Sequence, residues 1–166
     1  MRVLIVEDDE FKQKRIEHVV RDLDPATEVF SERSVNSGLR GIVELKPDLI
    51  LLDMSLTTFD IGPGESGGRP QNFGGMEILR QMERLEIVVP VIVITQHERF
   101  AKPGSDEVHL SAVQIELRER HEQVFKGLIY YNSAAGGWEK HLRTHITQVV
   151  RRSRERGVPK NTRRRR

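Results

Sequence analysis

The stretch PDLILLDM at residues 47–54 decides the fold of this sequence. Four consecutive apolar residues follow Pro47 and Asp48 and are closed by a second carboxylate, Asp53. A continuous apolar run of this length, rather than an alternating one, is typical of a strand buried on both faces of a parallel sheet. The stretch therefore predicts a central strand whose carboxyl end presents Asp53.

Further strands and helices alternate on either side of this stretch. Residues 3–6 and 88–94 are also continuously apolar and predict two more buried strands. Residues 28–30 predict a weaker strand and residues 127–131 a fifth. Apolar side chains at helical spacing lie between and after the strands: Phe11, Ile16, Val19, Val20 and Leu23; Leu39, Ile42 and Val43; Ile78, Leu79, Met82 and Leu85; and Trp138, Leu142, Ile146, Val149 and Val150. Five strand–helix repeats predict an α/β fold, a doubly wound, flavodoxin-like five-stranded parallel sheet.

Two regions are longer than such repeats require. Residues 57–74 are rich in Gly and Pro and predict an extended loop after the Asp53 strand, either a surface insertion or a flap beside the site. In the remodelled region 97–124, the apolar spacing favours a helix, although residues 113–117 also alternate and leave a strand open. We expect one domain over residues 1–152 and a basic, disordered tail over residues 153–166.

The composition limits the class of protein. With 166 residues the chain can form one domain with a core, and it has no cysteine for a disulfide framework or a thiolate metal site. The apolar run at residues 3–6 is too short for a signal peptide, and no stretch approaches the ~20 apolar residues of a membrane span. We therefore expect a soluble, cytoplasmic protein with no membrane partner.

The net charge of +2 conceals an asymmetry. Residues 151–166 hold nine basic residues against one acid, Glu155, so this segment carries +8 and the rest of the chain −6. The segment could bind nucleic-acid phosphates or an acidic protein surface. It contains no aromatic residue for base stacking, so nucleic-acid binding is the lesser alternative.

Carboxylates follow the first and third predicted strands. Glu7 and Asp8 end the first strand, Asp53 ends the third, and Thr95 ends the fourth. Ligands bind beyond the carboxyl ends of the strands in such sheets, and clustered carboxylates need a divalent cation or a raised pKa. An all-oxygen ligand set favours Mg²⁺, beside which a carboxylate can attack a phosphoryl group. The alternative interpretation is that the acids at residues 7–9 only begin a helix, where negative charge is favoured. For Asp9 this interpretation and a functional role are equally well supported.

Three of these stretches resemble the signature strands of response-regulator receiver domains: VLIVEDD at residues 3–9, PDLILLDM at 47–54 and VPVIVIT at 89–95. GGMEIL at residues 74–79 is similar to the third helix of that family. The resemblance covers residues 1–96 well and the rest loosely. It implies the receiver fold.

The resemblance also implies roles for five residues. Asp53 would be the phosphoacceptor, and Glu7 and Asp8 would be Mg²⁺ ligands together with Asp53 itself. Ser55 would bind the metal through its backbone carbonyl. Thr95 would provide the switch hydroxyl.

The sequence departs from the family at the fifth strand. Receivers normally place a lysine at its end, but residues 128–133 contain none. Lys126 lies at the opposite end, roughly 15–20 Å away, and cannot substitute. Asn132 could donate a hydrogen bond but brings no charge. This departure predicts weaker phosphoryl transfer and weaker coupling to the switch.

These observations predict a stand-alone response regulator in a phosphorelay. A sensor histidine kinase or phosphotransfer protein would phosphorylate Asp53, and the output would be association with a downstream protein. A turnover enzyme has the least support. The alternative is a pseudo-receiver that acts as a phosphorylation-independent interaction module, and the missing lysine favours it.

Overall fold

The computed structural model describes residues 1–60, 73–100 and 107–157. Its elements, in chain order, are β1 (Arg2–Val6), α1 (Glu10–Leu23), β2 (Glu28–Glu32), α2 (Val35–Leu45), β3 (Leu49–Leu52), α3 (Gly74–Arg84), β4 (Val91–Thr95), β5 (Arg99–Phe100), β6 (Val108–His109), α4 (Leu110–Arg120), β7 (Phe125–Tyr130) and α5 (Trp138–Gly157).

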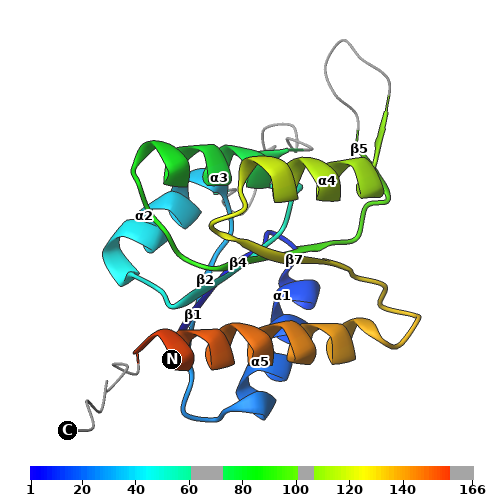
Figure 1. Ribbon diagram of the computed structural model, residues 1–166. Coiled ribbons are helices and arrows are strands. Elements are labelled where there is room, and N and C mark those ends of the chain that lie inside the picture. Colours follow the sequence, from blue (N-terminus) through cyan, green and yellow to red (C-terminus); the bar gives the residue numbers. More distant parts are fainter. Residues whose placement is uncertain (61–72, 101–106, 158–166) are drawn as a thin grey trace, which may run out of the picture.

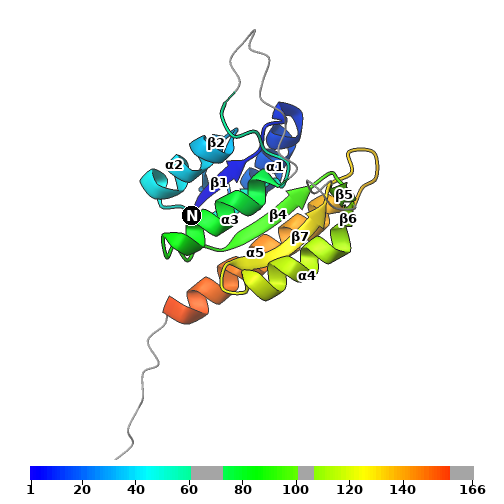
Figure 2. The same ribbon diagram turned by 90° about the horizontal axis from the view of Figure 1, so that it is seen from above.

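The predicted parallel sheet is confirmed. Five strands pair in the order β2-β1-β3-β4-β7, and every neighbouring pair is parallel. The strands therefore end at one edge, as the arrows of β1, β4 and β7 show in Figure 2. The apolar run in PDLILLDM forms β3, which lies at the centre of the sheet with all four residues buried.

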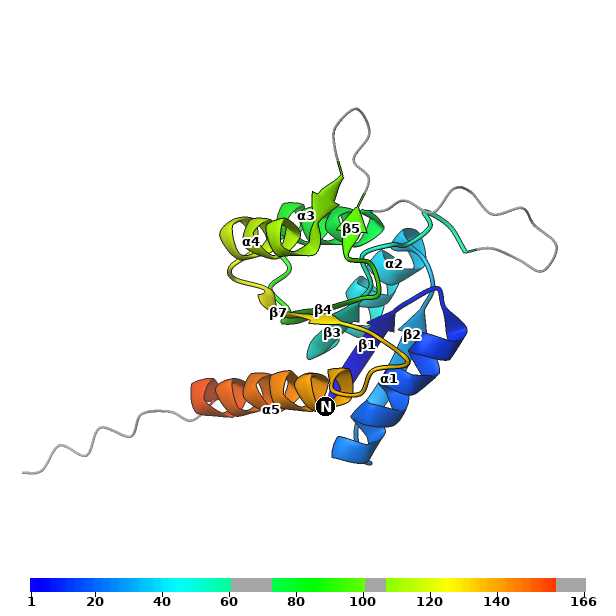
Figure 3. The ribbon, with the colours of Figure 1, turned by 90° about the vertical axis from the view of Figure 1, so that its right-hand side faces the viewer.

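Helices cover both faces of the sheet (Figures 1 and 3). Helices α1 and α5 lie on one face, while α2, α3 and α4 lie on the other. Successive strand residues point to opposite faces, so the central strands contribute to two separate cores. Leu4 and Val6 of β1 join the core under α2, α3 and α4, whereas Val3 and Ile5 join the core under α1 and α5. Burial on both faces explains why these strands are continuously apolar.

The predicted apolar stripes were wrong at three positions. Phe11, Val43 and Leu85 are 65%, 52% and 56% exposed. Phe11 and Val43 lie beside the buried faces of α1 and α2 rather than on them, because neighbouring residues on a helix differ by about 100° in direction. Leu85 follows the last residue of α3 and caps that helix. On α1 the buried face instead begins with Lys12, which is 1% exposed.

The second half of the domain is helical where the sequence left a strand open. Residues 110–120 form α4, with Val113 and Leu117 buried and Ile115 58% exposed. A two-stranded antiparallel pair, β5 with β6, precedes α4 and was not predicted. Helix α5 continues to Gly157, so residues 153–157 are helical and the prediction of a disordered tail from residue 153 was wrong there.

Three predicted features lie partly or wholly outside the described residues: most of the Gly-rich loop (61–72), the loop within region 97–124 (101–106) and the end of the basic tail (158–166). Within the described ranges, none of the helices combines the length and the apolar composition needed to cross a bilayer.

Candidate functional site

Asp53 is the first residue after β3 and is 5% exposed. Its backbone N–H donates to the Val6 carbonyl at 3.0 Å, which ties it to the end of β1. Its Oδ2 accepts a hydrogen bond from the Ser55 N–H at 2.8 Å, and its Oδ1 accepts one from the Lys12 ammonium at 2.6 Å. The carboxylate is therefore buried, oriented and paired.

Glu7 and Asp8 approach Asp53 from the end of β1. One carboxylate oxygen from each of the three residues lies within 4.8 Å of the others. Glu7 is 3% exposed, and its Oε1 accepts the Asp9 N–H at 3.0 Å. Asp8 is half-buried. The side chain of Asp9 caps α1 by accepting the Lys12 N–H at 2.9 Å, so for this residue the helix-start interpretation holds.

Lys12 crosses from α1 into this cluster. Its Nζ lies 2.6 Å from Asp53 Oδ1 and 2.6 Å from Glu7 Oε2, and it donates to the Ile94 carbonyl at 2.9 Å. The contact with Glu7 is an ion pair without hydrogen-bond geometry, so Glu7 Oε2 is buried with no hydrogen-bond partner. One cation thus serves carboxylates from two strands.

The electrostatics of the cluster follow from its burial. Burial raises the pKa of Glu7 to about 8, against the opposing effect of Lys12 and with a further contribution from Asp53. Burial and the Asp53 carboxylate also raise the pKa of Asp8. For Lys12, burial favours the neutral amine, but the Asp53 and Glu7 carboxylates outweigh it and the pKa is raised. The ammonium therefore stays charged. A further cation would favour the charged form of the carboxylates beside it, because it would offset their burial and their mutual repulsion.

Two glycines hold the segment after Asp53 against α3. A Cβ on Gly75 would lie 2.5 Å from the Asp53 carbonyl oxygen, and one on Gly74 would lie 2.6 Å from the Leu56 carbonyl oxygen. Both obstacles are backbone atoms, which cannot give way as a flexible side chain can. The start of α3 can approach the acidic cluster this closely only because both residues lack a side chain.

A family model described as a response regulator receiver domain matches residues 3–105. The chain belongs to the response regulator receiver family. Among curated proteins, this receiver is 29% identical to the uncharacterized protein y4jR of Sinorhizobium fredii over 84% of this chain and 92% of that protein. It is 24% identical to the Detocs response regulatory protein DtcB of Enterobacter cloacae over 90% of this chain and 100% of that protein.

Solved structures support the same fold. The receiver resembles a CheY-like response regulator receiver domain protein from Methanospirillum hungatei with a TM-score of 0.60 and 18% identity. The likeness covers 93% of this chain and 97% of that one. The predicted flavodoxin-like receiver fold is thus confirmed by topology and by comparison.

The acidic cluster of this receiver fits a magnesium ion. Among the described residues, one group of possible metal-ligating side chains lies close enough together to share an ion, and it consists of Glu7, Asp8 and Asp53. All their donors are oxygens, which hard cations such as Mg²⁺ prefer. The buried Glu7 Oε2, which forms an ion pair with Lys12 but accepts no hydrogen bond, is one of the oxygens that could bind it.

The other two predicted site residues lie at the same edge of the sheet. Thr95 ends β4 and is fully buried, and its Oγ1 accepts the His97 N–H at 3.2 Å. Ser55 lies two residues after Asp53, and its own hydroxyl is buried without a hydrogen-bond partner. The metal-ligand role of the Ser55 carbonyl and the switch role of Thr95 stay predictions.

Lys12 was not among the predicted site residues. A lysine partner for the acceptor was expected only at the end of the fifth strand, where the sequence has none. A signal was present in the sequence: Lys12 lies four, seven, eight and eleven residues before Ile16, Val19, Val20 and Leu23, which is the spacing of one helix face. A lysine on an otherwise apolar face needs a buried partner, and three carboxylates nearby could provide one.

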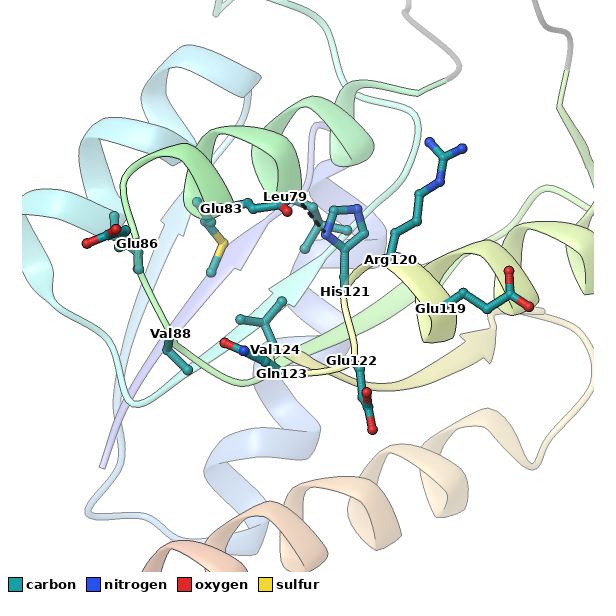
Figure 4. A pocket seen from close by; sticks show the side chains of 12 residues that line it. Leu79, Glu83, Glu86, Val88, Glu119, Arg120, His121, Glu122, Gln123 and Val124 are labelled. Atoms are coloured by element: carbon teal, nitrogen blue, oxygen red, sulfur yellow. Dashed lines mark ion pairs between the residues drawn. The ribbon is translucent and has the colours of Figure 1, made fainter.

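A concave feature lies at the opposite end of the sheet from Asp53 (Figure 4). It is a cavity of about 380 Å³ between the ends of α3 and α4 and the segments that precede β4 and β7. His121 is buried in its wall, with Nδ1 3.9 Å from an oxygen of Glu83 on α3. Because it borders the amino ends of β4 and β7, this cavity is separate from the Asp53 site.

Proposed function

We propose that this receiver accepts a phosphoryl group on Asp53, with Mg²⁺, from a sensor histidine kinase or a phosphotransfer protein. It then signals by associating with a downstream protein. One observation carries the proposal: a buried aspartate at the carboxyl end of the central strand shares a 4.8 Å cluster with Glu7 and Asp8. The similarity to a protein described as a response regulatory protein is consistent with a signalling role.

The reaction forms one bond and breaks one bond at phosphorus, and Asp53 is the protein group that takes part covalently. An oxygen of Asp53 forms a bond to phosphorus as the P–N bond of a phosphohistidine donor breaks. The electron pair stays on the imidazole nitrogen, which takes up a proton, and Asp53 becomes an acyl phosphate. A magnesium ion held by Glu7, Asp8 and Asp53 would neutralise the phosphoryl oxygens. The Ser55 N–H holds the acceptor in place at 2.8 Å, and Thr95 is proposed to hydrogen-bond the product.

A second candidate is a phosphorylation-independent interaction module. It is favoured by the ammonium of Lys12, which bridges Glu7 and Asp53 and balances part of their charge from within the chain. A site balanced in this way could keep its shape without a metal or a phosphoryl group. The two candidates differ in whether Asp53 responds to a phosphoryl mimic.

Thermal unfolding with and without beryllofluoride, a phosphoryl mimic, tests the proposal. Mg²⁺ should raise the melting temperature of the wild type, and beryllofluoride with Mg²⁺ should raise it further. A ligand at about 100 times its Kd adds about 2.7 kcal/mol to the free energy of unfolding, or roughly 5–10 °C for a chain of this size. Asp53→Asn should abolish the beryllofluoride increment.

Asp48→Asn is the matched control. Asp48 lies at the other end of β3, is exposed, and accepts a hydrogen bond from the Arg2 N–H, which an asparagine oxygen can also accept. This variant should respond like the wild type. A wild type that Mg²⁺ stabilises but beryllofluoride does not would favour the interaction module.

A further inference from the structure

We propose that Lys12, on the first turn of α1, is the cation that faces the phosphoryl group on Asp53. This inference rests on the function proposed above and assigns a residue to it. The positive charge beside the acceptor would then come from a helix on one face of the sheet and not from the end of β7. Four observations support the assignment.

The first is the position of the ammonium. Lys12 Nζ lies 2.6 Å from Asp53 Oδ1, and a carboxylate oxygen of Asp53 is what would bond to phosphorus. The ammonium donates hydrogen bonds to Asp53 Oδ1 and to the Ile94 carbonyl, and an oxygen of Glu7 lies 2.6 Å from it in an ion pair. These partners come from β3, β1 and β4, so the three central strands of the sheet locate the charge. Little reorganisation is needed to present it to a group on Asp53.

The second is the end of β7, the position at which receivers normally carry a lysine. In this chain the buried side chain there belongs to Tyr131. Tyr131 is the first residue after β7, is 4% exposed, and donates its N–H to the Thr95 carbonyl at 2.8 Å. Its ring centre lies 5.7 Å from Lys12 Nζ, within cation–π range. This edge strand therefore contributes an aromatic wall against the ammonium.

The third is the place of the alternative lysine. Lys126 belongs to the beginning of β7, and its Nζ donates to the carbonyls of Gln123 at 2.7 Å and Glu122 at 3.3 Å. It is held at the amino end of the strand, far from Asp53. In the described part of the chain, Lys12 is the cation paired with the acidic cluster.

The fourth is the balance of charge. Phosphorylation replaces one negative charge on Asp53 with about two, beside Glu7 and Asp8. A buried ammonium at hydrogen-bond distance is worth far more there than an exposed one, because water does not screen it. Lys12 is 1% exposed.

The shared contact with Glu7 makes the proposal sharply testable. Lys12 pairs with Glu7, which is also a proposed metal ligand, so the ammonium opposes a divalent cation while it favours an anionic phosphoryl group. Lys12→Met removes the charge and keeps most of the side-chain length. We expect it to tighten Mg²⁺ binding about tenfold. We expect it to weaken beryllofluoride binding in saturating Mg²⁺ about 100-fold.

Isothermal titration calorimetry measures both affinities on the full chain. Lys14→Met is the matched control, since Lys14 lies on the same helix, is 67% exposed and pairs only with Glu10 in the described residues. It should leave both affinities within twofold of the wild type. Lys12→Arg, which keeps the charge, should retain beryllofluoride binding better than Lys12→Met.

The outcomes separate this inference from the function on which it rests. Failure of the wild type itself to bind beryllofluoride would overturn both. If the wild type binds it and Lys12→Met binds it within threefold, only the role of Lys12 is overturned. Equal weakening of Mg²⁺ and beryllofluoride in Lys12→Met would show a purely structural lysine and would also overturn it.

A measurement on the unmodified side chain covers the case in which Lys12→Met does not fold. The ¹⁵N signal of the buried Lys12 ammonium should shift when beryllofluoride is added to the Mg²⁺-bound wild type. It should not shift in Asp53→Asn. An unmoved signal in a wild type that binds the mimic would contradict the proposal.

Discussion

The two ends of the sheet each bury a basic side chain next to a carboxylate, but only one end buries the carboxylate as well. At the carboxyl end, Lys12 lies 2.6 Å from Asp53, and the two side chains are 1% and 5% exposed. At the amino end, His121 lies 3.9 Å from Glu83, whose side chain is 69% exposed. Glu83 can therefore turn to solvent, whereas Asp53 cannot.

This difference in burial decides what each pair can do. A carboxylate in water gains little from a nearby cation and costs little when it is removed. Two buried charges depend on each other, because removal of one leaves the other without solvent or partner. We therefore expect a change of charge to have a large effect on stability at the carboxyl end and only a small effect at the amino end.

The largest effect is expected from breaking the buried pair. In Mg²⁺-free buffer, Lys12→Met should lower the free energy of unfolding by about 3–5 kcal/mol, because Asp53 and Glu7 lose their shared cation. At the other end, Glu83→Gln should change it by no more than about 0.5 kcal/mol. Urea unfolding measures both. Similar values for the two variants would remove the contrast between the ends.

The next effect tests how tightly the carboxyl end is packed. Gly75→Ala should cost about 1–3 kcal/mol, since its Cβ would meet the Asp53 carbonyl oxygen at 2.5 Å and the backbone must shift. Gly136→Ala is the control, because no atom lies within 4 Å of a Cβ built there. Unfolding in urea should separate the two. A fully stable Gly75→Ala would mean that the segment after Asp53 can relax.

A smaller effect of opposite sign is expected at Asp8. Burial and then the Asp53 carboxylate raise the pKa of Asp8, and the second contribution is a repulsion between the two carboxylates. Asp8→Asn should therefore raise the Mg²⁺-free stability slightly, by at most about 1 kcal/mol. The same variant should lose the stabilisation by Mg²⁺, because it lacks one ligand. Thermal scans with EDTA and with Mg²⁺ give both quantities, and a variant still stabilised by Mg²⁺ would contradict the ligand role.

The smallest effect is a pH dependence at the amino end. Burial lowers the pKa of His121, with Glu83 and Glu116 opposing the shift and Arg120 and Arg80 adding to it. At His121 the unfolded chain therefore binds a proton at higher pH than the folded protein, so the contribution of His121 to stability is lost as the pH falls below about 6.5.

Replacement of the imidazole tests this origin. On going from pH 7.5 to 5.5, His121→Gln should lose less stability, or gain more, than the wild type, as measured by urea unfolding at both values. His18→Gln, at an exposed histidine of α1, should show the same change as the wild type. An unaltered slope in His121→Gln would place the titration elsewhere.

Most of the fold followed from local patterns. The apolar runs predicted the five sheet strands, and for β3 the bounds agree residue by residue. The errors arose where a pattern was compatible with two orientations, as at Phe11 beside Lys12, since an apolar side chain at the border of a helix face can lie on either side of it. The short pair β5 and β6 carries no periodic signal because each strand has two residues.

The sequence by itself determined that carboxylates would gather at one edge of a parallel sheet, because that result needs only strand ends and the rule that parallel strands end together. Only the tertiary structure decided which cation joins them. Lys12 meets Asp53 across 41 residues and Ile94 across 82, so its burial depends on partners that local spacing does not specify. A lysine is solvated by default, and long-range packing against buried carboxylates is what makes its burial favourable here.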